Sequence, residues 1–138
     1  MTKLSFIIVQ WLCLVAAGMI IIQGEGQSLM EKVVRVENDL GDGINLNVHC
    51  KSGDSDIGEH DLAKGQYIQW SFNCSWLGTT LFWCSMKWEN VQGSFDVFDF
   101  KRDFPLCGFK CWWSIRHDAA YFYVETKDVW EKRYVWPK

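Results

Sequence analysis

The sequence predicts an all-β fold, a small antiparallel β-sandwich of seven to eight strands stabilised by two disulfides. Apolar and polar residues alternate through much of the chain, and turn-forming residues recur about every ten positions. No segment keeps the 3.6-residue repeat of a helix. The third observation is the number of cysteines, six in a chain of 138 residues, which is long enough for one small domain.

Two segments show the alternation most clearly. In INLNVHCK (44–51), Ile44, Leu46 and Val48 share one face, and YIQWSFN (67–73) repeats the pattern. Further segments rich in β-branched or aromatic residues are predicted strands: 33–38, 79–88, 94–100, 111–117, 120–126 and 129–136. Turn-forming residues separate them, and the longest predicted loops are 51–65 and 102–110.

Residues 1–26 predict a secretory signal peptide, which leaves residues 27–138 as the mature domain. MTK provides a basic start, residues 4–22 are mostly apolar, and residues 23–28 are polar. An uncleaved membrane anchor is the alternative, since ~18 or more apolar residues can span a bilayer. A cleaved signal peptide predicts a secreted, extracellular protein that has no membrane segment once the signal is removed.

The cysteines predict a disulfide framework. One of them, Cys13, lies in the leader, so the mature domain keeps five, and pairing leaves one over. A zinc site is disfavoured because the Cys107-x-x-x-Cys111 pair has no obvious second Cys/His pair. The acidic loop 51–65 could offer oxygen ligands to calcium, but it lacks the EF-hand order, so a solvated turn is favoured. No metal and no cofactor is predicted.

The charged residues favour a non-enzymatic protein. The net charge is −3, with acids and bases interspersed, and no basic stripe suggests nucleic-acid binding. The three histidines, His49, His60 and His117, match no nucleophile motif. A hydrolase that uses two of them with a lysine is the weaker alternative.

Aromatic residues raise a second possible function. Trp112 and Trp113 are adjacent in a predicted strand, so one should point into the core and the other outward. Outward aromatic side chains on a sheet can stack on sugars or anchor a protein partner. A secreted carbohydrate-binding or defence-related module is therefore the alternative function.

An ordered set of motifs between Val33 and Tyr123 resembles the plant self-incompatibility S-protein family. The motifs are Asn38-Asp39-Leu40, His49-Cys50-Lys51-Ser52, Trp70-x-Phe72, Gly78-x-Thr80-x-Phe82-x-Cys84, Phe95-x-Val97-Phe98-Asp99, and the Cys107/Cys111 pair followed by aromatic residues. The resemblance implies a small, secreted, mainly β plant protein. It further implies a non-enzymatic extracellular signalling ligand for a cell-surface receptor protein, as in the self-incompatibility response that rejects self pollen.

The resemblance also sorts the cysteines. Family members have four cysteines in two disulfides, which implies Cys50, Cys84, Cys107 and Cys111 in a pairing left open. The extra Cys74 ends the strand 67–73, where a buried free thiol is predicted. A disulfide-linked dimer through Cys74, in place of a monomer, is the alternative.

Two surface features complete the predicted sites. Asn73 opens an Asn-Cys-Ser sequon, which predicts N-glycosylation. The loop that contains Lys101, Arg102, Asp103 and Phe104 is the predicted partner-binding loop, together with 51–65, because ligand proteins often carry recognition on loops of a rigid scaffold. A disulfide-pinned connection with solubilising charges is the alternative reading of residues 101–104.

Overall fold

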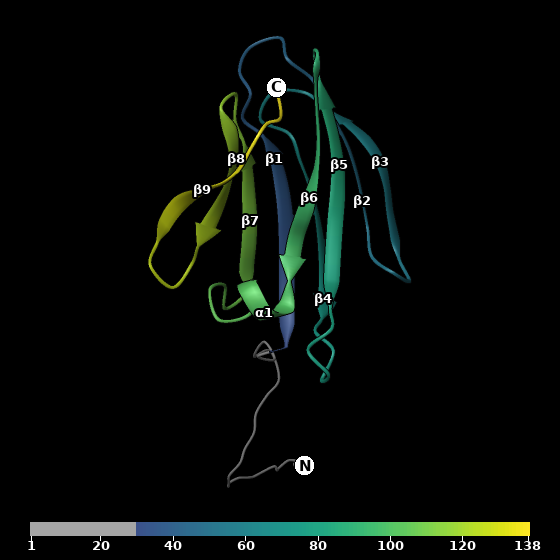
Figure 1. Cartoon of the computed structure of the whole chain (residues 1–138), viewed down its shortest axis with the longest axis vertical. Helices are drawn as coiled ribbons and strands as arrows, with labels where there is room; N and C mark the ends of the chain where they lie inside the picture. The colour runs from purple at the N-terminus through teal and green to yellow at the C-terminus, as the bar shows by residue number, and fades with distance from the viewer. Residues whose placement is uncertain (1–29) are drawn as a thin grey trace, which may run out of the picture.

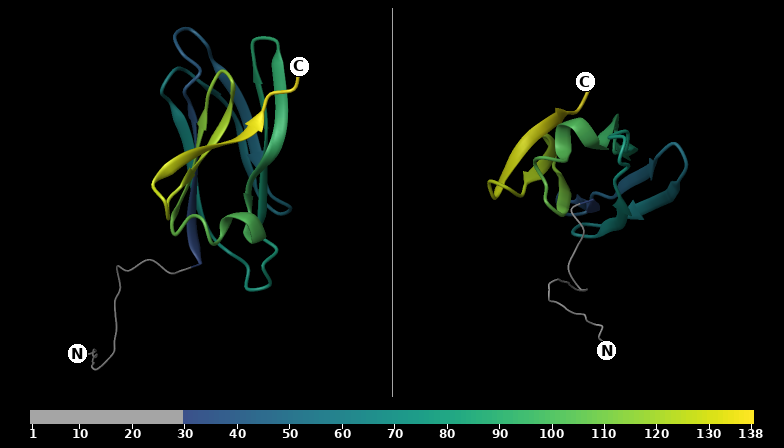
Figure 2. Two further views of the ribbon diagram at one scale, coloured as in Figure 1. Left: turned by 60° about the vertical axis from the view of Figure 1, so that its left-hand side comes forward. Right: turned by 90° about the horizontal axis from the view of Figure 1, so that it is seen from below.

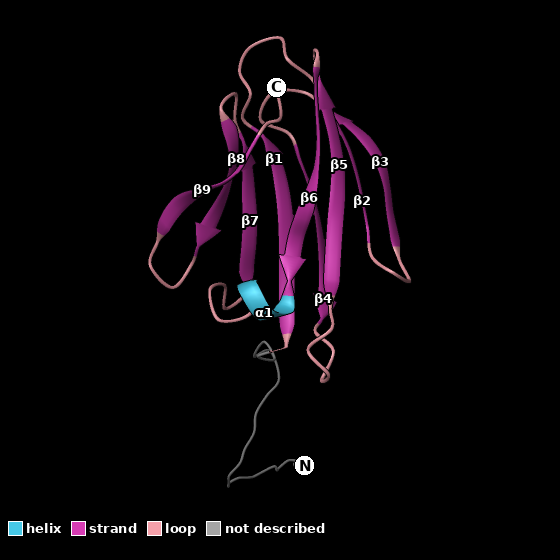
Figure 3. Ribbon diagram, in the orientation of Figure 1, coloured by secondary structure: helices cyan, strands magenta, loops and turns pink. Residues whose placement is uncertain are grey.

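The computed structural model describes residues 30–138, which form two β-sheets packed face to face (Figure 1). The predicted signal peptide, residues 1–26, lies outside the described residues. Within 30–138 no helix is long and apolar enough to cross a membrane. The one helix in that range is a single turn, and strands make up nearly all the rest of the regular structure (Figure 3).

Nine strands make up the two sheets. The five-stranded sheet has the order β4 (Tyr67–Asn73), β1 (Glu31–Asn38), β7 (Lys110–Ile115), β8 (Ala119–Val124) and β9 (Val129–Val135). The four-stranded sheet has the order β3 (Asp56–Leu62), β2 (Leu46–Lys51), β5 (Leu81–Trp88) and β6 (Val91–Asp99). The short helix α1 (Phe100–Asp103) follows β6.

The all-β sandwich is confirmed, with one strand more than predicted. The extra strand, β3, lies within the segment 51–65 that was predicted as a loop. Its sequence DIGEHDL shows no apolar alternation because β3 is an edge strand in which only Leu62 is buried. Backbone pairing with β2 and polar cross-strand pairs hold it: Asn47 Nδ2 donates to Glu59 Oε2 (2.8 Å) and to Asp61 Oδ1 (2.9 Å).

The sheets are not purely antiparallel. β1 pairs with β4 antiparallel but with β7 parallel, and the other pairs are antiparallel. The parallel pair joins the first and seventh strands of the described chain, so it depends on the chain path and not on any local signal.

The inward faces of both sheets form one core. Its largest fully buried side chains include Trp113, Phe98, Phe122, Leu46 and Met86. The Trp113 indole Nε1 donates to Val97 O (2.8 Å), so β7 of one sheet is bonded to β6 of the other. Trp113 points inward and Trp112 lies half-buried on the outer face, as the strand alternation predicted.

β9 closes one side of the sandwich against β6. A Cβ at Gly93 would lie 2.9 Å from the Tyr134 ring and 3.1 Å from the Trp136 ring, so the close approach requires glycine here. Figure 2 shows β9 crossing toward this side of the molecule.

The disulfides join Cys50 to Cys84 and Cys107 to Cys111. Cys50 and Cys84 face each other on the neighbouring strands β2 and β5, so the first bridge lies within one sheet. The second bridge closes the connection that enters β7. Cys74 is unpaired within residues 30–138 and buried.

Candidate recognition surface at one end of the sandwich

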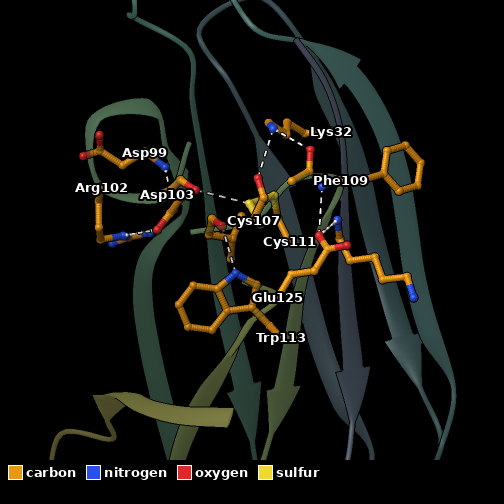
Figure 4. Close-up of a disulfide and its surroundings, with 12 residues drawn as sticks. Lys32, Asp99, Arg102, Asp103, Cys107, Phe109, Cys111, Trp113 and Glu125 are labelled. Carbon is orange, nitrogen blue, oxygen red and sulfur yellow. Dashed lines mark hydrogen bonds and ion pairs between the residues drawn. A yellow bond between two sulfur atoms is a disulfide. The ribbon is translucent and has the colours of Figure 1, made fainter. Parts of the chain in front are cut away.

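The predicted partner-binding loop belongs to the connection between β6 and β7, residues 100–109. Figure 4 shows this connection around the Cys107–Cys111 disulfide. It begins with α1, where Asp99 acts as N-cap because its Oδ1 accepts a hydrogen bond from Lys101 N (3.1 Å).

Asp103 is completely buried and holds this connection together. It accepts hydrogen bonds from Arg102 Nε and Nη2, both at 2.7 Å, and from Asp99 N at 3.0 Å. Arg133 Nη1 of β9 lies 3.6 Å from Asp103 Oδ1. The buried charge is thereby compensated, and Asp103 is not available to a partner, unlike the exposed Lys101 and Arg102.

Lys32 holds the far end of the same connection from β1. It is 2% exposed, its Nζ donates to Cys107 O (3.0 Å) and Gly108 O (2.6 Å), and it lies 4.4 Å from the Phe104 ring centroid. Burial lowers the pKa of Lys32 because desolvation disfavours the ammonium form. Lys32 was not predicted as a site residue, although the alternation does place it on the inward face with Val34.

Glu125 completes the attachment from the other side. Its Oε1 accepts hydrogen bonds from Phe109 N (2.9 Å) and Lys110 N (2.7 Å). The connection is therefore held by a disulfide, a buried carboxylate, a buried lysine and Glu125, which makes it a rigid part of the scaffold.

The connection between β4 and β5, residues 74–80, lies beside α1 at the same end (Figures 1 and 2). Phe100 N donates to Thr80 O (3.2 Å), and a Cβ at Gly78 would lie 3.4 Å from the Phe100 ring. Phe100 in turn stacks on Phe104 with ring centroids 4.6 Å apart. The two connections therefore form one continuous surface.

The tip of the β4–β5 connection presents apolar side chains to solvent. Trp76 is 90% exposed and Leu77 is 85% exposed, more than any other large apolar side chain in residues 30–138. Ser75 Oγ accepts from Leu77 N (3.1 Å), and Gly78 N donates to Ser75 O (3.0 Å) in a tight turn that ends at Gly78 with φ +70°. This turn holds both side chains away from the core.

Asn73 and Cys74 flank this tip. The Asn73 side chain is exposed and borders a hollow of about 770 Å³ that Ser52, Thr80 and Trp83 also line. Cys74 N donates to Met30 O (2.7 Å), and its thiol lies at the edge of the core. Burial raises the pKa of Cys74, while the nearby Lys32 opposes this shift.

The histidines lie in three separate places. His49 Nε2 is 2.7 Å from Asp56 Oδ1 on the outer face of the four-stranded sheet, His60 Nε2 lies 3.2 Å from Ile57 O, and His117 packs on Trp88 with ring centroids 4.7 Å apart. In the described range the structure contains no group of three His, Cys, Asp or Glu side chains that could hold a metal ion.

The fold and these two connections define a class: small, disulfide-stabilised β-sandwiches with a rigid end that displays exposed apolar and basic side chains. The family model described as Plant self-incompatibility protein S1 matches residues 33–136. The chain belongs to this family.

Individual relatives support the assignment. S-protein homolog 29 of Arabidopsis thaliana is 38% identical over 104 residues, 75% of this chain and 76% of the relative. Self-incompatibility protein S1 of Papaver rhoeas is 29% identical over 100 residues, 71% of this chain and 72% of the relative.

The fold is also found in a solved structure described as that of SPH (Self-Incompatibility Protein Homologue) proteins, a widespread family of small, highly stable, secreted proteins from plants. The TM-score is 0.60 at 20% identity, covering 80% of this chain and 97% of that one. Family membership makes the chain a secreted, extracellular plant protein.

Proposed function

We propose that this chain is a secreted, non-enzymatic signalling ligand that a cell-surface receptor protein recognises through one end. We call this end the recognition end and define it by Trp76, Leu77, Lys101, Arg102 and Phe104. The observation that carries the proposal is the exposed Trp76–Leu77 tip beside a rigid basic loop. Tryptophan and arginine dominate the energetics of protein interfaces, especially where the scaffold is already ordered.

Family membership supports a signalling role. One relative is named self-incompatibility protein S1. We therefore propose rejection of self pollen as the first response to test. The separation of the three histidines supports a non-enzymatic protein, since acid–base catalysis needs such groups within reach of one substrate. The proposed mature domain is residues 27–138, released from a signal peptide of residues 1–26.

Binding to plant cell surfaces tests the receptor role. Purified mature protein should bind intact pollen or leaf protoplasts saturably, and the double variant Trp76→Ser/Leu77→Ser should bind at least about tenfold more weakly. Val135→Ser is the matched control, because Val135 is an apolar side chain that is 63% exposed on β9. Protease treatment of the cells should abolish binding. Equal binding to protease-treated cells or to pure lipid vesicles would contradict a protein receptor.

We further propose that Asn73 carries an N-linked glycan, which its exposed side chain and its sequon support. Treatment of the plant-secreted protein with an N-glycosidase should lower its mass, and Asn73→Gln should remove that difference. We propose a monomer, because the buried Cys74 thiol would have to leave the core edge to bridge two chains. A dimer on non-reducing electrophoresis that Cys74→Ser abolishes would contradict this.

A further inference from the structure

The outer face of the five-stranded sheet carries a row of side chains that spans all five of its strands. The strand register aligns Gln69 with Arg35, Arg35 with Trp112, and Tyr123 with Trp130. Trp112 and Tyr123 have ring centroids 6.1 Å apart, and Tyr123 and Trp130 5.1 Å. We call this set the aromatic row: Gln69, Arg35, Trp112, Tyr123 and Trp130.

Cations lie directly on the rings at one end of the row. The Arg35 Cζ atom is 4.0 Å from the Trp112 ring centroid and 4.1 Å from that of Tyr67, so the guanidinium is stacked between two rings. Lys110 Nζ lies 4.9 Å from the Trp112 centroid. Tyr67 is 47% exposed, which leaves this cluster open to solvent.

A third cation, Arg116, lies at the other end of the row. The Arg116 Cζ atom lies 4.1 Å from the Tyr121 ring centroid and 5.6 Å from that of Trp130, which is 41% exposed. The face therefore presents positive charge at both ends of a series of rings.

These cations have unused hydrogen-bonding capacity. In residues 30–138, Arg35, Lys110 and Arg116 form no ion pair. Each arginine uses Nε internally, Arg35 to Gln69 Oε1 (2.9 Å) and Arg116 to Ser114 Oγ (3.0 Å). Within the same range no hydrogen bond is formed by the Nη groups of either side chain.

Three neighbouring carboxylates accept hydrogen bonds from within the protein. Glu125 accepts from two backbone N–H groups, Asp118 accepts from Tyr121 and Asp128 from Tyr123. Glu37 lies in the next row, where burial and then the nearby Asp39 raise its pKa. The charge of Arg35 opposes this shift, but no ion pair joins Arg35 and Glu37 in residues 30–138.

The outer face of the other sheet differs. The aromatic row contains three aromatic rings. On the other sheet, the strand register places Lys51, Trp83 and Asp96 side by side, and only one of these three is aromatic. The next aligned set is Glu59, His49, Ser85 and Ser94. Of these two outer faces, one combines a row of rings with cations that form no ion pair. The outer face of the four-stranded sheet therefore serves as an internal control for experiments.

We infer that the outer face of the five-stranded sheet binds a linear oligosaccharide of uronic acids. Sugar rings can place their apolar C–H faces on Tyr123 and Trp130, while Trp112 holds Arg35 in place and guanidinium groups donate paired hydrogen bonds to carboxylates. A neutral glycan would use the rings and leave the cations unpaired. A nucleic acid is disfavoured because the protein is extracellular. The inference goes beyond the receptor role and uses none of the recognition end.

Titration with a defined-length oligogalacturonate tests the inference on the intact mature protein. We expect saturable binding by calorimetry, a change in tryptophan fluorescence, and weaker binding as salt is raised. The fully methyl-esterified oligomer, in which the carboxylates are neutralised, should bind at least about tenfold more weakly, since charge-assisted hydrogen bonds are lost.

Variants on the two faces locate the site. Arg35→Gln/Arg116→Gln should weaken binding at least about tenfold through the loss of charge-assisted hydrogen bonds, and Trp130→Ala should weaken it severalfold. The matched controls, Lys87→Gln and Trp83→Ala on the opposite face, should leave affinity unchanged. Near-ultraviolet circular dichroism verifies that each variant is folded. Trp130 is exposed, so its replacement does not alter the core.

Four results would overturn the inference: no saturable binding, equal affinity for the methyl ester, tighter binding of a single-stranded oligonucleotide, or equal losses in the variants of the opposite face. The receptor proposal is tested separately, because Trp76→Ser/Leu77→Ser leaves the aromatic row intact. Either result can therefore fail without the other.

Discussion

Two neighbouring connections at one end of the sandwich show burial opposite to what their residue types suggest. The β6–β7 connection is rich in charge, yet its Asp103 is completely buried. The β4–β5 connection carries apolar side chains at its tip, yet Trp76 is 90% exposed. The two segments touch through Phe100, so they share a location and differ only in what surrounds each side chain.

In these two loops, the burial of a side chain depends on the groups available to contact it and not on its own polarity. Asp103 can be buried because Arg102, Arg133 and the Asp99 N–H surround its charge. Trp76 stays outside because a tight turn closed by Ser75 holds it beyond the reach of the core. The first connection is a rigid support, and the tip of the second presents its apolar side chains to solvent.

The largest expected effect is the loss of the buried charge. Asp103→Asn keeps the shape but leaves two guanidinium groups without their carboxylate, so the free energy of unfolding should fall by about 3 kcal/mol. Urea denaturation measures this. Asp54→Asn in an exposed turn is the control, with an expected change within about 0.5 kcal/mol. A loss below about 1 kcal/mol for Asp103→Asn would show that its burial is not compensated in this way.

Removal of the disulfide in the same connection should have the next largest effect. Cys107→Ala/Cys111→Ala opens a loop with a sequence separation of 4. Such a short loop restricts the unfolded chain little, so the expected loss is about 2 kcal/mol, seen as a lower urea midpoint with an unchanged slope. Retention of full stability would mean that Lys32 and Glu125 are sufficient to hold the connection.

Lys32 should contribute less. Lys32→Met leaves Cys107 O and Gly108 O without their buried donor but also removes a desolvated ammonium group, so the expected loss is about 1 kcal/mol. Lys32→Gln, which retains a donor, should lose less. If the two variants were equally destabilised, the hydrogen bonds would not be the cause.

The two connections should also differ in their response to alkaline pH. The folded pKa of Cys74 is raised by burial, so above the unfolded value of about 8.5 the unfolded chain loses a proton first. Stability should therefore fall as pH rises through this window, and Cys74→Ala should remove that fall. The contribution of Lys32 to stability changes with pH in the opposite direction. Its folded pKa is lowered, so the unfolded state binds more protons, and stability rises as the pH approaches the unfolded pKa of about 10.4. Urea midpoints from neutral to alkaline pH separate the two, and an unchanged profile in Cys74→Ala would contradict the assignment.

The smallest expected effect on stability belongs to the exposed tip. Trp76→Ser/Leu77→Ser removes side chains that are already in solvent, so the free energy of unfolding should change by no more than about 0.5 kcal/mol. Thermal unfolding checks this while the binding experiment above reads out function. A larger loss would mean that the tip packs on the scaffold in solution.

Local alternation predicted most of the strands and the direction of their side chains. It placed one of Trp112 and Trp113 inward and the other outward, which the structure confirms with Trp113 in the core. It failed for β3, whose polar residues lie on an edge strand held by backbone pairing with β2. It also did not identify the burial of Asp103, because the second guanidinium partner, Arg133, lies on the last strand.

The sequence by itself determined the family, the all-β class and the residues that face the core, because a strand's period of two is a local property. Only the tertiary structure decided which strands are neighbours. That choice pairs Cys50 with Cys84 across β2 and β5, sets β1 parallel to β7, and aligns Arg35, Trp112 and Trp130 in one row. Each of these depends on residues far apart in the chain, and the path that joins them is fixed by the shared core and not by any single segment.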